Sequence, residues 1–142
     1  MSGDDSAEND FLQTLRIRAV LERYCSLLDS GAVNDLLGLF ADDCVFTMMG
    51  RTYEGKAEFG TVWAEAKPLA RPTTLHALVN PDIRVDGERA DAVSSFVLVS
   101  RGADGSTQIT FAGRYVDELC RDGGGHWRFT RRQVETLARP SA

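Results

Sequence analysis

The sequence predicts a single α+β domain in which helices pack on one face of a curved sheet. Helical periodicity is confined to the N-terminal half of the chain, whereas the part after Pro72 consists of extended runs separated by turns. A length of 142 residues suits one domain with one hydrophobic core. We expect residues 7–138 to form that domain, with a disordered tail at residues 1–6 and a short tail at residues 139–142.

Three helices are predicted in the N-terminal half. Residues 5–8 have the spacing of a capping box, and apolar side chains then recur at helical spacing as far as Ser30, so a long helix should end at Gly31. A second helix is expected over residues 33–40, ended by the two aspartates at 42–43. The third should begin after Gly55 and stop at Pro68, because proline lacks the amide hydrogen that a helix interior needs.

The remaining elements are predicted to be strands. A short apolar strand over residues 44–49 turns at Gly50, and residues 52–53 can pair back on it. Four longer strands follow, at residues 73–85, 90–100, 107–120 and 127–137. Pro81 should force a bulge or bend in the first of these, because proline cannot donate to a strand ladder. The 90–100 strand is apolar on both faces, which is typical of a sheet covered on both sides.

Composition and charge exclude several classes of function. A net charge of −5 argues against binding to nucleic acid or to an anionic membrane, because no basic excess exists to neutralise phosphates. No apolar run is long enough to cross a membrane. The three cysteines include no closely spaced pair, which argues against a disulfide framework or a zinc site and favours the cytoplasm. No metal or cofactor motif is present, so we expect neither.

His76 is the first candidate for chemistry. It lies mid-strand among apolar residues, where an imidazole held away from water can act as an acid or base near neutral pH. Period-two alternation places it on one strand face with Thr74, Leu78 and Asn80. A core histidine bonded to a backbone carbonyl is equally compatible with this spacing.

Asp29 is the second candidate, because it lies in the last turn of the long helix, where the helix dipole disfavours a carboxylate. It is either a solvated acid or a carboxylate that orients a histidine. Tyr24 lies roughly 140° round the helix from it and fits a core position, although its phenol could point into a cavity. Alternation leaves open whether Arg131 or Arg132 turns inward, where a guanidinium could bind an enolate or carbonyl oxygen.

Six segments carry a resemblance to a known family. They are RYCSLLDSG (23–31), LFADD (39–43), YEGK (53–56), TLHALVNPDIRVDG (74–87), GRYVD (113–117) and GHWRFTRR (125–132). The chain resembles a SnoaL-like domain of the nuclear-transport-factor-two-like superfamily, over nearly all of its length. This likeness implies a cone-shaped, cystatin-like α+β fold, in which three N-terminal helices pack on a curved mixed, mostly antiparallel sheet and enclose one pocket.

The resemblance also implies a site. Lyases of this group pair a helix aspartate with a strand histidine, and Asp29 and His76 fall at the matching positions. Tyr24 matches a polar helper, and Arg132 matches an arginine that reaches the pocket. By the same likeness, the cavity should be lined by Phe40, Trp63, Val97, Val99, Phe111 and Tyr115. Relatives commonly form homodimers through the outer face of the sheet, where we expect Phe96, Leu98, Val116 and Trp127.

The leading hypothesis is a cofactor-independent lyase or isomerase of the dehydratase or polyketide-cyclase type. In it, Asp29 holds neutral His76 as a general base toward a small, largely apolar carbonyl substrate. Two alternatives stay open: a non-catalytic binding or assembly module of the same fold, and a hydrolase of the epoxide-hydrolase type.

Overall fold

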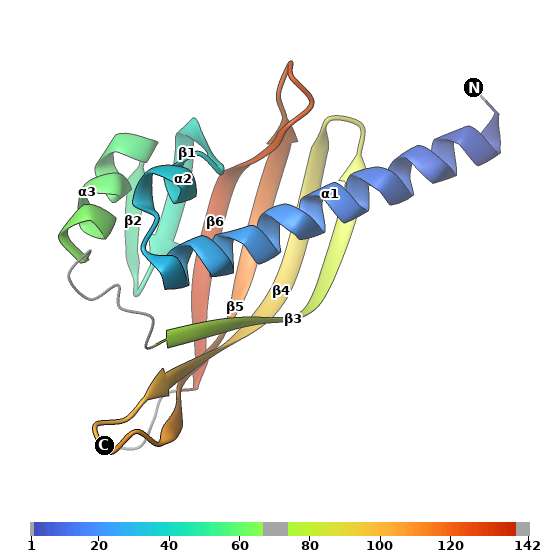
Figure 1. The fold of residues 1–142 in the computed structure, drawn as a ribbon. Helices are drawn as coiled ribbons and strands as arrows, with labels where there is room; N and C mark the ends of the chain where they lie inside the picture. The colour runs from blue at the N-terminus through green and yellow to red at the C-terminus, as the bar shows by residue number, and fades with distance from the viewer. Residues whose placement is uncertain (1, 67–73, 139–142) are drawn as a thin grey trace.

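The computed structural model describes residues 2–66 and 74–138 (Figure 1). Its elements, in chain order, are α1 (Gly3–Ser30), α2 (Val33–Leu37), β1 (Phe40–Met48), β2 (Arg51–Glu54), α3 (Lys56–Ala66), β3 (Thr74–Asp86), β4 (Arg89–Arg101), β5 (Thr107–Arg121) and β6 (Trp127–Ala138). The strands form one six-stranded sheet in the order β2-β1-β6-β5-β4-β3. Neighbouring strands are antiparallel except for β1 and β6, which run parallel. The predicted α+β class, with a mixed and mostly antiparallel sheet, is confirmed.

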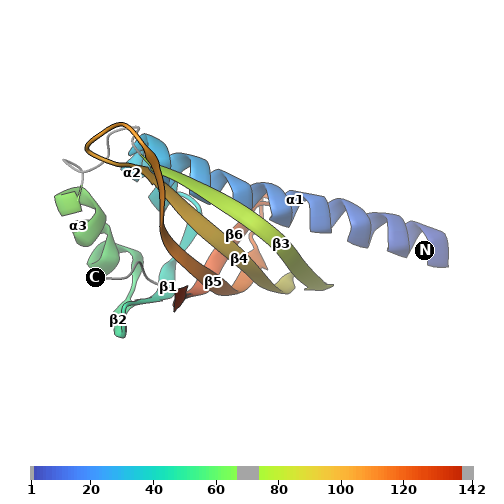
Figure 2. The same ribbon diagram turned by 90° about the horizontal axis from the view of Figure 1, so that it is seen from below.

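The helices lie on one face of the sheet and at one edge of it. α1 crosses the face of the sheet, while α2 and α3 lie beside the β1–β2 edge (Figures 1 and 2). Ile17, Leu21 and Tyr24 of α1 follow the predicted helical spacing, and none of them is more than 2% exposed. This buried stripe fixes the position of the helix that carries Asp29.

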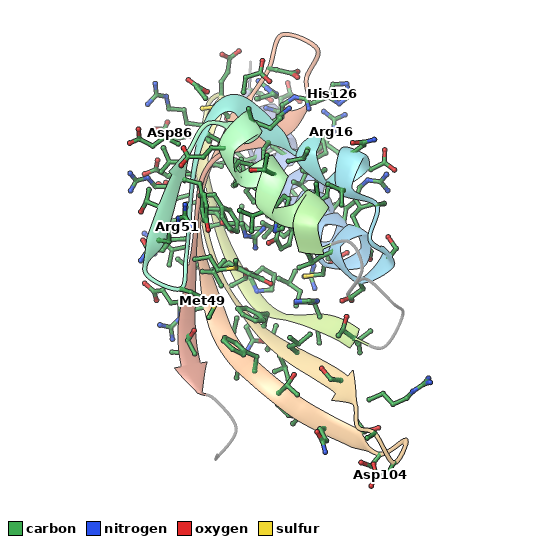
Figure 3. The ribbon with its side chains drawn as sticks, turned by 90° about the vertical axis from the view of Figure 1, so that its left-hand side faces the viewer. Arg16, Met49, Arg51, Asp86, Asp104 and His126 are labelled. Carbon is green, nitrogen blue, oxygen red and sulfur yellow. The ribbon has the colours of Figure 1, made fainter. Side chains whose placement is uncertain are left out.

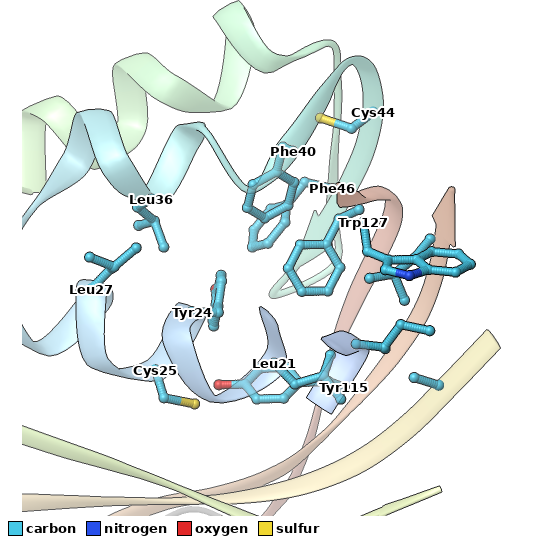
Figure 4. Close-up of a cluster of buried hydrophobic side chains, with 14 of the residues drawn as sticks. Leu21, Tyr24, Cys25, Leu27, Leu36, Phe40, Cys44, Phe46, Tyr115 and Trp127 are labelled. Carbon is cyan, nitrogen blue, oxygen red and sulfur yellow. The ribbon is translucent and has the colours of Figure 1, made fainter. Parts of the chain in front are cut away.

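An aromatic cluster ties α1 and α3 to β1 and β6. Its members are Tyr24, Phe40, Phe46, Phe59, Trp63 and Phe129, all buried. Figure 4 shows three of its members, Tyr24, Phe40 and Phe46. Neighbouring ring centroids lie 4.9–6.2 Å apart, mostly in tilted or edge-to-face arrangements. Such pairs add to the stability that burial of the rings already provides, so this end of the domain is a packed core.

α1 begins earlier than predicted. Ser2 is its N-cap, and the Ser2 hydroxyl accepts a hydrogen bond from the Asp5 amide at 3.4 Å. Residues 3–6, which we expected in a disordered tail, are therefore helical, and the acids of the first turn complement the helix dipole. The predicted end is confirmed, because Gly31 adopts a left-handed φ of 73° and donates its amide to the carbonyls of the last turn.

The second helix is shorter than predicted. It ends at Leu37, and Phe40 already belongs to β1, where it pairs with Phe129 of β6. Phe40 has helical spacing from Val33, but pairing with a neighbouring strand overrides this weak local preference. The prediction that residues 42–43 end a helix is wrong, since both aspartates lie within β1.

The predicted irregularity at Pro81 is confirmed. The register between β3 and β4 shifts between Val79 and Asp82, and Asn80 adopts a left-handed φ of 51°. A bulge of this kind bends its strand, which helps β3 to curve toward α1. The predicted helix stop at Pro68 and the tail at residues 139–142 lie outside the described residues.

The outer face of the sheet, away from α1, is covered by no helix in the described part of the chain. Val93 lies there at 41% exposure and pairs with Val116. Within the described part of the chain, helices therefore cover the 90–100 strand on one face only. Phe96, Leu98 and Trp127, which we expected on the outer face, point to the α1 side instead. No helix of the described residues is both long and apolar enough to span a membrane.

Candidate active site

Asp29 and His76 lie together, at the end of α1 and near the start of β3. His76 Nδ1 is 2.5 Å from Asp29 Oδ1, and the His76 backbone amide donates to Asp29 Oδ2 at 2.8 Å. The Thr74 hydroxyl donates to Oδ1 at 3.3 Å. The two side chains of the pair are 14% and 16% exposed, so they are shielded from solvent but still reachable. Three groups of one strand therefore fix the carboxylate, and the carboxylate orients the imidazole.

Local sequence explains why the pair forms. Gly31 ends α1 at a fixed point, which leaves Asp29 in the last turn, where the unpaired helix carbonyls disfavour a carboxylate. The backbone amide of His76 and the hydroxyl of Thr74 supply the donors that offset this cost. Thr74 and His76 share one strand face by period-two alternation, as predicted, so both reach the same acid.

The His76 ring borders a cavity of about 200 Å³ between α1 and the inner face of the sheet. Its lining is mostly apolar and consists of Tyr24, Leu28, Met48, Met49, His76, Phe96, Leu98, Phe111, Tyr115, Val134 and Thr136. Met49 lies in the turn between β1 and β2, at one rim (Figure 3), and is 69% exposed. Because Nδ1 contacts Asp29, Nε2 is the ring nitrogen available to a molecule in the cavity.

Only some of the predicted lining residues reach this cavity. Tyr24, Phe111 and Tyr115 line it. Phe40 and Trp63 do not, because both are packed in the aromatic cluster.

The two valines predicted to line the cavity lie on the opposite face of β4. Leu98 is the cross-strand partner of His76, whereas Val97 pairs with Ala77 and Val99 with Leu75. Side chains of directly paired residues share a face, so the inward set on β4 contains Phe96 and Leu98. The prediction for Val97 and Val99 is wrong.

Arg132 turns inward, but it does not reach the cavity. Its side chain is fully buried, whereas Arg131 is exposed. The guanidinium carbon lies 3.9 Å from the ring centroid of Tyr24 and 3.7 Å from that of Tyr115, behind both rings. Its Nε is 3.4 Å from Oδ1 of Asp117, on β5. The expectation that Arg132 contacts a substrate is therefore wrong, and its place is the core beneath the cavity.

A comparison with protein families identifies the family of the chain. The profile of the SnoaL-like domain matches residues 10–133. The chain belongs to the SnoaL-like domain family. No curated protein sequence matches it.

Solved structures share the fold of this SnoaL-like domain. A proposed scytalone dehydratase from Novosphingobium aromaticivorans is 21% identical with a TM-score of 0.83, covering 96% of this chain and 91% of that one. A nuclear-transport-factor-two-like protein with a cystatin-like fold from the same organism is 24% identical with a TM-score of 0.83, over 96% and 90%. The beta subunit of a proposed aromatic-ring-hydroxylating dioxygenase, also from this organism, is 23% identical with a TM-score of 0.78, over 92% and 93%. The predicted cystatin-like fold is confirmed.

Burial affects the two phenols that line the cavity of this SnoaL-like domain. It raises the pKa of Tyr24 and of Tyr115 above the ordinary value of a phenol, although the nearby Arg132 cation acts in the opposite direction. Both phenols are therefore neutral and can donate a hydrogen bond. Burial also raises the pKa of the Cys25 thiol to about 11, so this cysteine is a poor nucleophile. Figure 4 shows its sulfur beside the Tyr115 hydroxyl.

Sequence reasoning missed several lining residues. Val134 and Thr136 share the inward face of β6 with Arg132, so alternation could have found them. Leu28 lies four residues from Tyr24 on α1. Nothing in the sequence indicated that Met48 and Met49 line the cavity, because their position depends on where the β1–β2 turn meets the end of β6. Within the described residues, no three His, Cys, Asp or Glu side chains are grouped so that they could hold a metal ion.

Proposed function

We propose that this SnoaL-like domain is a cofactor-independent lyase or isomerase of the dehydratase or cyclase type. In this proposal, the Asp29–His76 pair removes a proton from a carbon next to a carbonyl group. The observation that carries the proposal is the 2.5 Å contact between Nδ1 and the carboxylate, in a ring that borders an apolar cavity. A base with one nitrogen held by an acid and the other facing a cavity is suited to proton transfer.

The proton transfer follows from the hydrogen bonds of the pair. The Asp29 carboxylate accepts the Nδ1 proton, which leaves the lone pair of Nε2 directed to the cavity. Nε2 then takes the proton from carbon, and the carboxylate stabilises the imidazolium that forms. The electrons of the broken C–H bond move to the carbonyl oxygen as an enolate. The enolate either expels a leaving group from the next carbon or takes the proton back at another position.

The enolate oxygen needs a hydrogen-bond donor, and Tyr24 is our candidate. It lines the cavity, and burial keeps its phenol protonated. The Arg132 guanidinium lies against its ring and favours negative charge there, which strengthens the phenol as a donor. Tyr115 also lines the cavity, but its hydroxyl lies beside Cys25.

The cavity favours a small and largely apolar substrate. A volume of about 200 Å³ lies below the usual range of ligand pockets, which begins at roughly 300 Å³. Its polar groups are few, namely the imidazole, two phenols and the Thr136 hydroxyl. We therefore infer an aromatic or polyketide-derived carbonyl compound, because a sugar or a phosphate would leave too many polar groups unpaired.

The hydrolase alternative has little support. Chemistry of the epoxide-hydrolase type needs additional acids around a bound water, and no aspartate or glutamate lines the cavity among the described residues. The binding-module alternative is compatible with the fold of the dioxygenase beta subunit, which is a likeness of fold alone. It predicts ligand binding without proton transfer, so an experiment can separate it from the lyase.

The test uses indanone, a small aryl ketone, as a probe of base strength in the cavity. The wild type should accelerate uptake of deuterium from D2O at the carbon next to the carbonyl, measured by proton NMR. His76→Gln should lose this acceleration, while His126→Gln, at the exposed second histidine, should keep it. Equal exchange in the wild type and in His76→Gln would refute the dyad. Thermal stabilisation by indanone without exchange would favour the binding module.

A further inference from the structure

The N-terminal part of α1 projects beyond the sheet (Figures 1 and 2). Gln13 is the first buried residue of the helix, and its Oε1 accepts a hydrogen bond from Trp127 Nε1 at 2.9 Å. Every residue from Ser2 to Leu12 is exposed. A helical segment this short is marginal in water even with a good N-cap, because helix stability in proteins comes mainly from packing. The projecting segment is therefore held only by continuity with the packed part of α1, and its apolar side chains are left uncovered.

A stripe of four residues, with two leucines at its centre, runs along the side of α1 that faces away from the sheet. Glu8, Leu12, Leu15 and Ala19, here called the α1 stripe, are spaced four, three and four residues apart and are all exposed. Leu12 is 44% exposed, Leu15 is 48% exposed, and the adjacent Phe11 is 67% exposed. This spacing is the heptad seam through which helices pair. Apolar side chains gathered in this way mark a contact surface.

The α1 stripe is symmetric about its own midpoint, which lies between Gln13 and Thr14. If two copies of the helix lie antiparallel across that point, Leu12 of each copy falls opposite Leu15 of the other. Glu8 likewise falls opposite Ala19, where the small side chain leaves room for it. A two-fold interface requires self-complementarity of this kind.

Charges beside the α1 stripe are complementary in the same register. Asp5 and Arg23 lie on the same flank of the helix, because they are five full turns apart. In the antiparallel arrangement Asp5 of one copy meets Arg23 of the other, within about one residue, or about 1.5 Å, of the same level. In an antiparallel helix pair, each flank of one helix faces the same flank of the other helix. Asp5 of one copy and Arg23 of the other therefore meet on the same side of the seam.

An open groove of about 720 Å³ runs along this flank, between α1, α2 and the turn from β5 to β6. Arg16 and Arg23 line it together with Arg128 and His126, and Figure 3 shows Arg16 and His126 at the same end of the molecule. Within the described part of the chain, neither Arg16 nor Arg23 has an ion-pair partner, whereas Arg128 pairs with Asp122 at 3.0 Å. Asp35 also lines the groove, but it is one acid beside three arginines, so the groove suits occupation by the acidic projecting helix end of a second copy.

We propose that α1 pairs antiparallel with α1 of a second copy of this chain through the α1 stripe, with Asp5 of each copy seated against Arg23 of the other. This surface lies on the opposite side of the molecule from the outer sheet face, and the pairing does not depend on the proposed enzyme activity. If the outer sheet face also forms a dimer, pairing through α1 joins two such dimers and doubles the number of chains in the assembly.

The test measures mass in solution by light scattering and sedimentation velocity. Leu12→Glu/Leu15→Glu should halve the mass of the wild-type species, with helix content by circular dichroism showing that the chain is still folded. Arg23→Asp and Asp5→Arg should each raise the dissociation constant by on the order of tenfold, because two ion pairs become repulsive. Arg101→Asp, at an exposed site on β4, is the matched control and should leave the mass unchanged.

A charge swap tests the register. Mixing Arg23→Asp with Asp5→Arg, or combining both changes in one chain, restores two opposite-charge pairs and should restore the wild-type mass. The proposal is overturned if the wild type and Leu12→Glu/Leu15→Glu have the same mass. It is also overturned if the single charge variants dissociate but the swap does not recover the assembly.

Discussion

Two acid–base pairs lie a short distance apart on the inner side of this domain, and they are built differently. Asp29 contacts His76 at 2.5 Å, accepts two further hydrogen bonds and is partly exposed. Asp117 faces Arg132 at 3.4 Å, and both side chains are fully buried. Within the described residues, neither Asp117 nor Arg132 has a side-chain hydrogen bond of good geometry.

The difference indicates two roles. The Asp29–His76 pair has its geometry fixed by hydrogen bonds and leaves one ring nitrogen toward a cavity, which suits chemistry. In the Asp117–Arg132 pair, the flat guanidinium instead packs against the rings of both Tyr24 and Tyr115, which meet each other edge to face, and this arrangement suits packing. A buried pair of this kind contributes little net stability, but losing one partner leaves the other uncompensated.

The largest expected effect is on activity. His76→Gln should lower the indanone exchange rate to the background, a loss of roughly 10²–10⁴-fold, because a positioned general base contributes about that much. Its free energy of unfolding in urea should change by only about 1 kcal/mol, since glutamine can still donate to Asp29. A large loss of stability in this variant would instead indicate that His76 has a structural role, as Asp117 and Arg132 do, and the two pairs would then not differ in role.

The second-largest effect is a loss of stability when the Asp117–Arg132 pair is broken. Arg132→Met should lower the free energy of unfolding by about 3–5 kcal/mol, because it leaves Asp117 buried without a cation and removes the contacts with both tyrosine rings. Urea denaturation measures this loss. Arg132→Met combined with Asp117→Leu should recover much of it, since apolar side chains can replace a buried pair. No recovery in the double variant would indicate that the pair itself holds the fold.

A third expectation concerns pH. Burial raises the pKa of Asp117 from 3.8 to about 6, against the attraction of Arg132. The native state therefore binds more protons than the unfolded chain between about pH 4 and 6, so this group's contribution to stability falls as pH rises through that window and is constant above it. The total change is on the order of 3 kcal/mol. Chemical denaturation across this range should show the fall in the wild type relative to Asp117→Asn, and parallel curves would contradict it.

The smallest effect tests the hydrogen bond from Thr74 that supports the Asp29–His76 pair. Thr74→Val removes the hydroxyl that donates to Asp29 Oδ1 and keeps the shape of the side chain. We expect a loss of about 1 kcal/mol in stability, as for a typical hydrogen bond, and a loss of a few-fold in exchange rate. An unchanged exchange rate would mean that the contact with the His76 amide alone is enough to orient the acid.

Local patterns predicted much of the fold and of the pair. Helical spacing in α1, the stop at Gly31 and the irregularity at Pro81 depend on neighbouring residues, so the sequence carries them directly. Asp29 lies at a helix C-terminus, where the helix dipole disfavours a carboxylate, and this already indicated that other groups stabilise it there. The predicted end of the second helix was wrong because Phe40 pairs in parallel with Phe129 of β6, which is distant in sequence.

The cavity could be predicted only in part, and β4 shows why. Its residues are apolar at both odd and even positions, so alternation defines two faces without saying which one is inward. The pairing of Leu98 with His76 settles this, and a shift of one residue would have exchanged the faces. Arg131 and Arg132 posed the same problem on β6, where the register with β5 shifts beside them.

The sequence by itself determined the α+β class, through periodicity, and the family likeness, through six short segments. That likeness in turn indicated Asp29 and His76 as the candidate pair. The tertiary structure alone decided that His76 Nδ1 contacts the Asp29 carboxylate and that Val97 and Val99 face outward. It also decided that Arg132 packs against the rings of Tyr24 and Tyr115 and does not reach the cavity. Each of these depends on strand register and on the packing of α1 over the sheet, which are set by contacts between residues far apart in the chain.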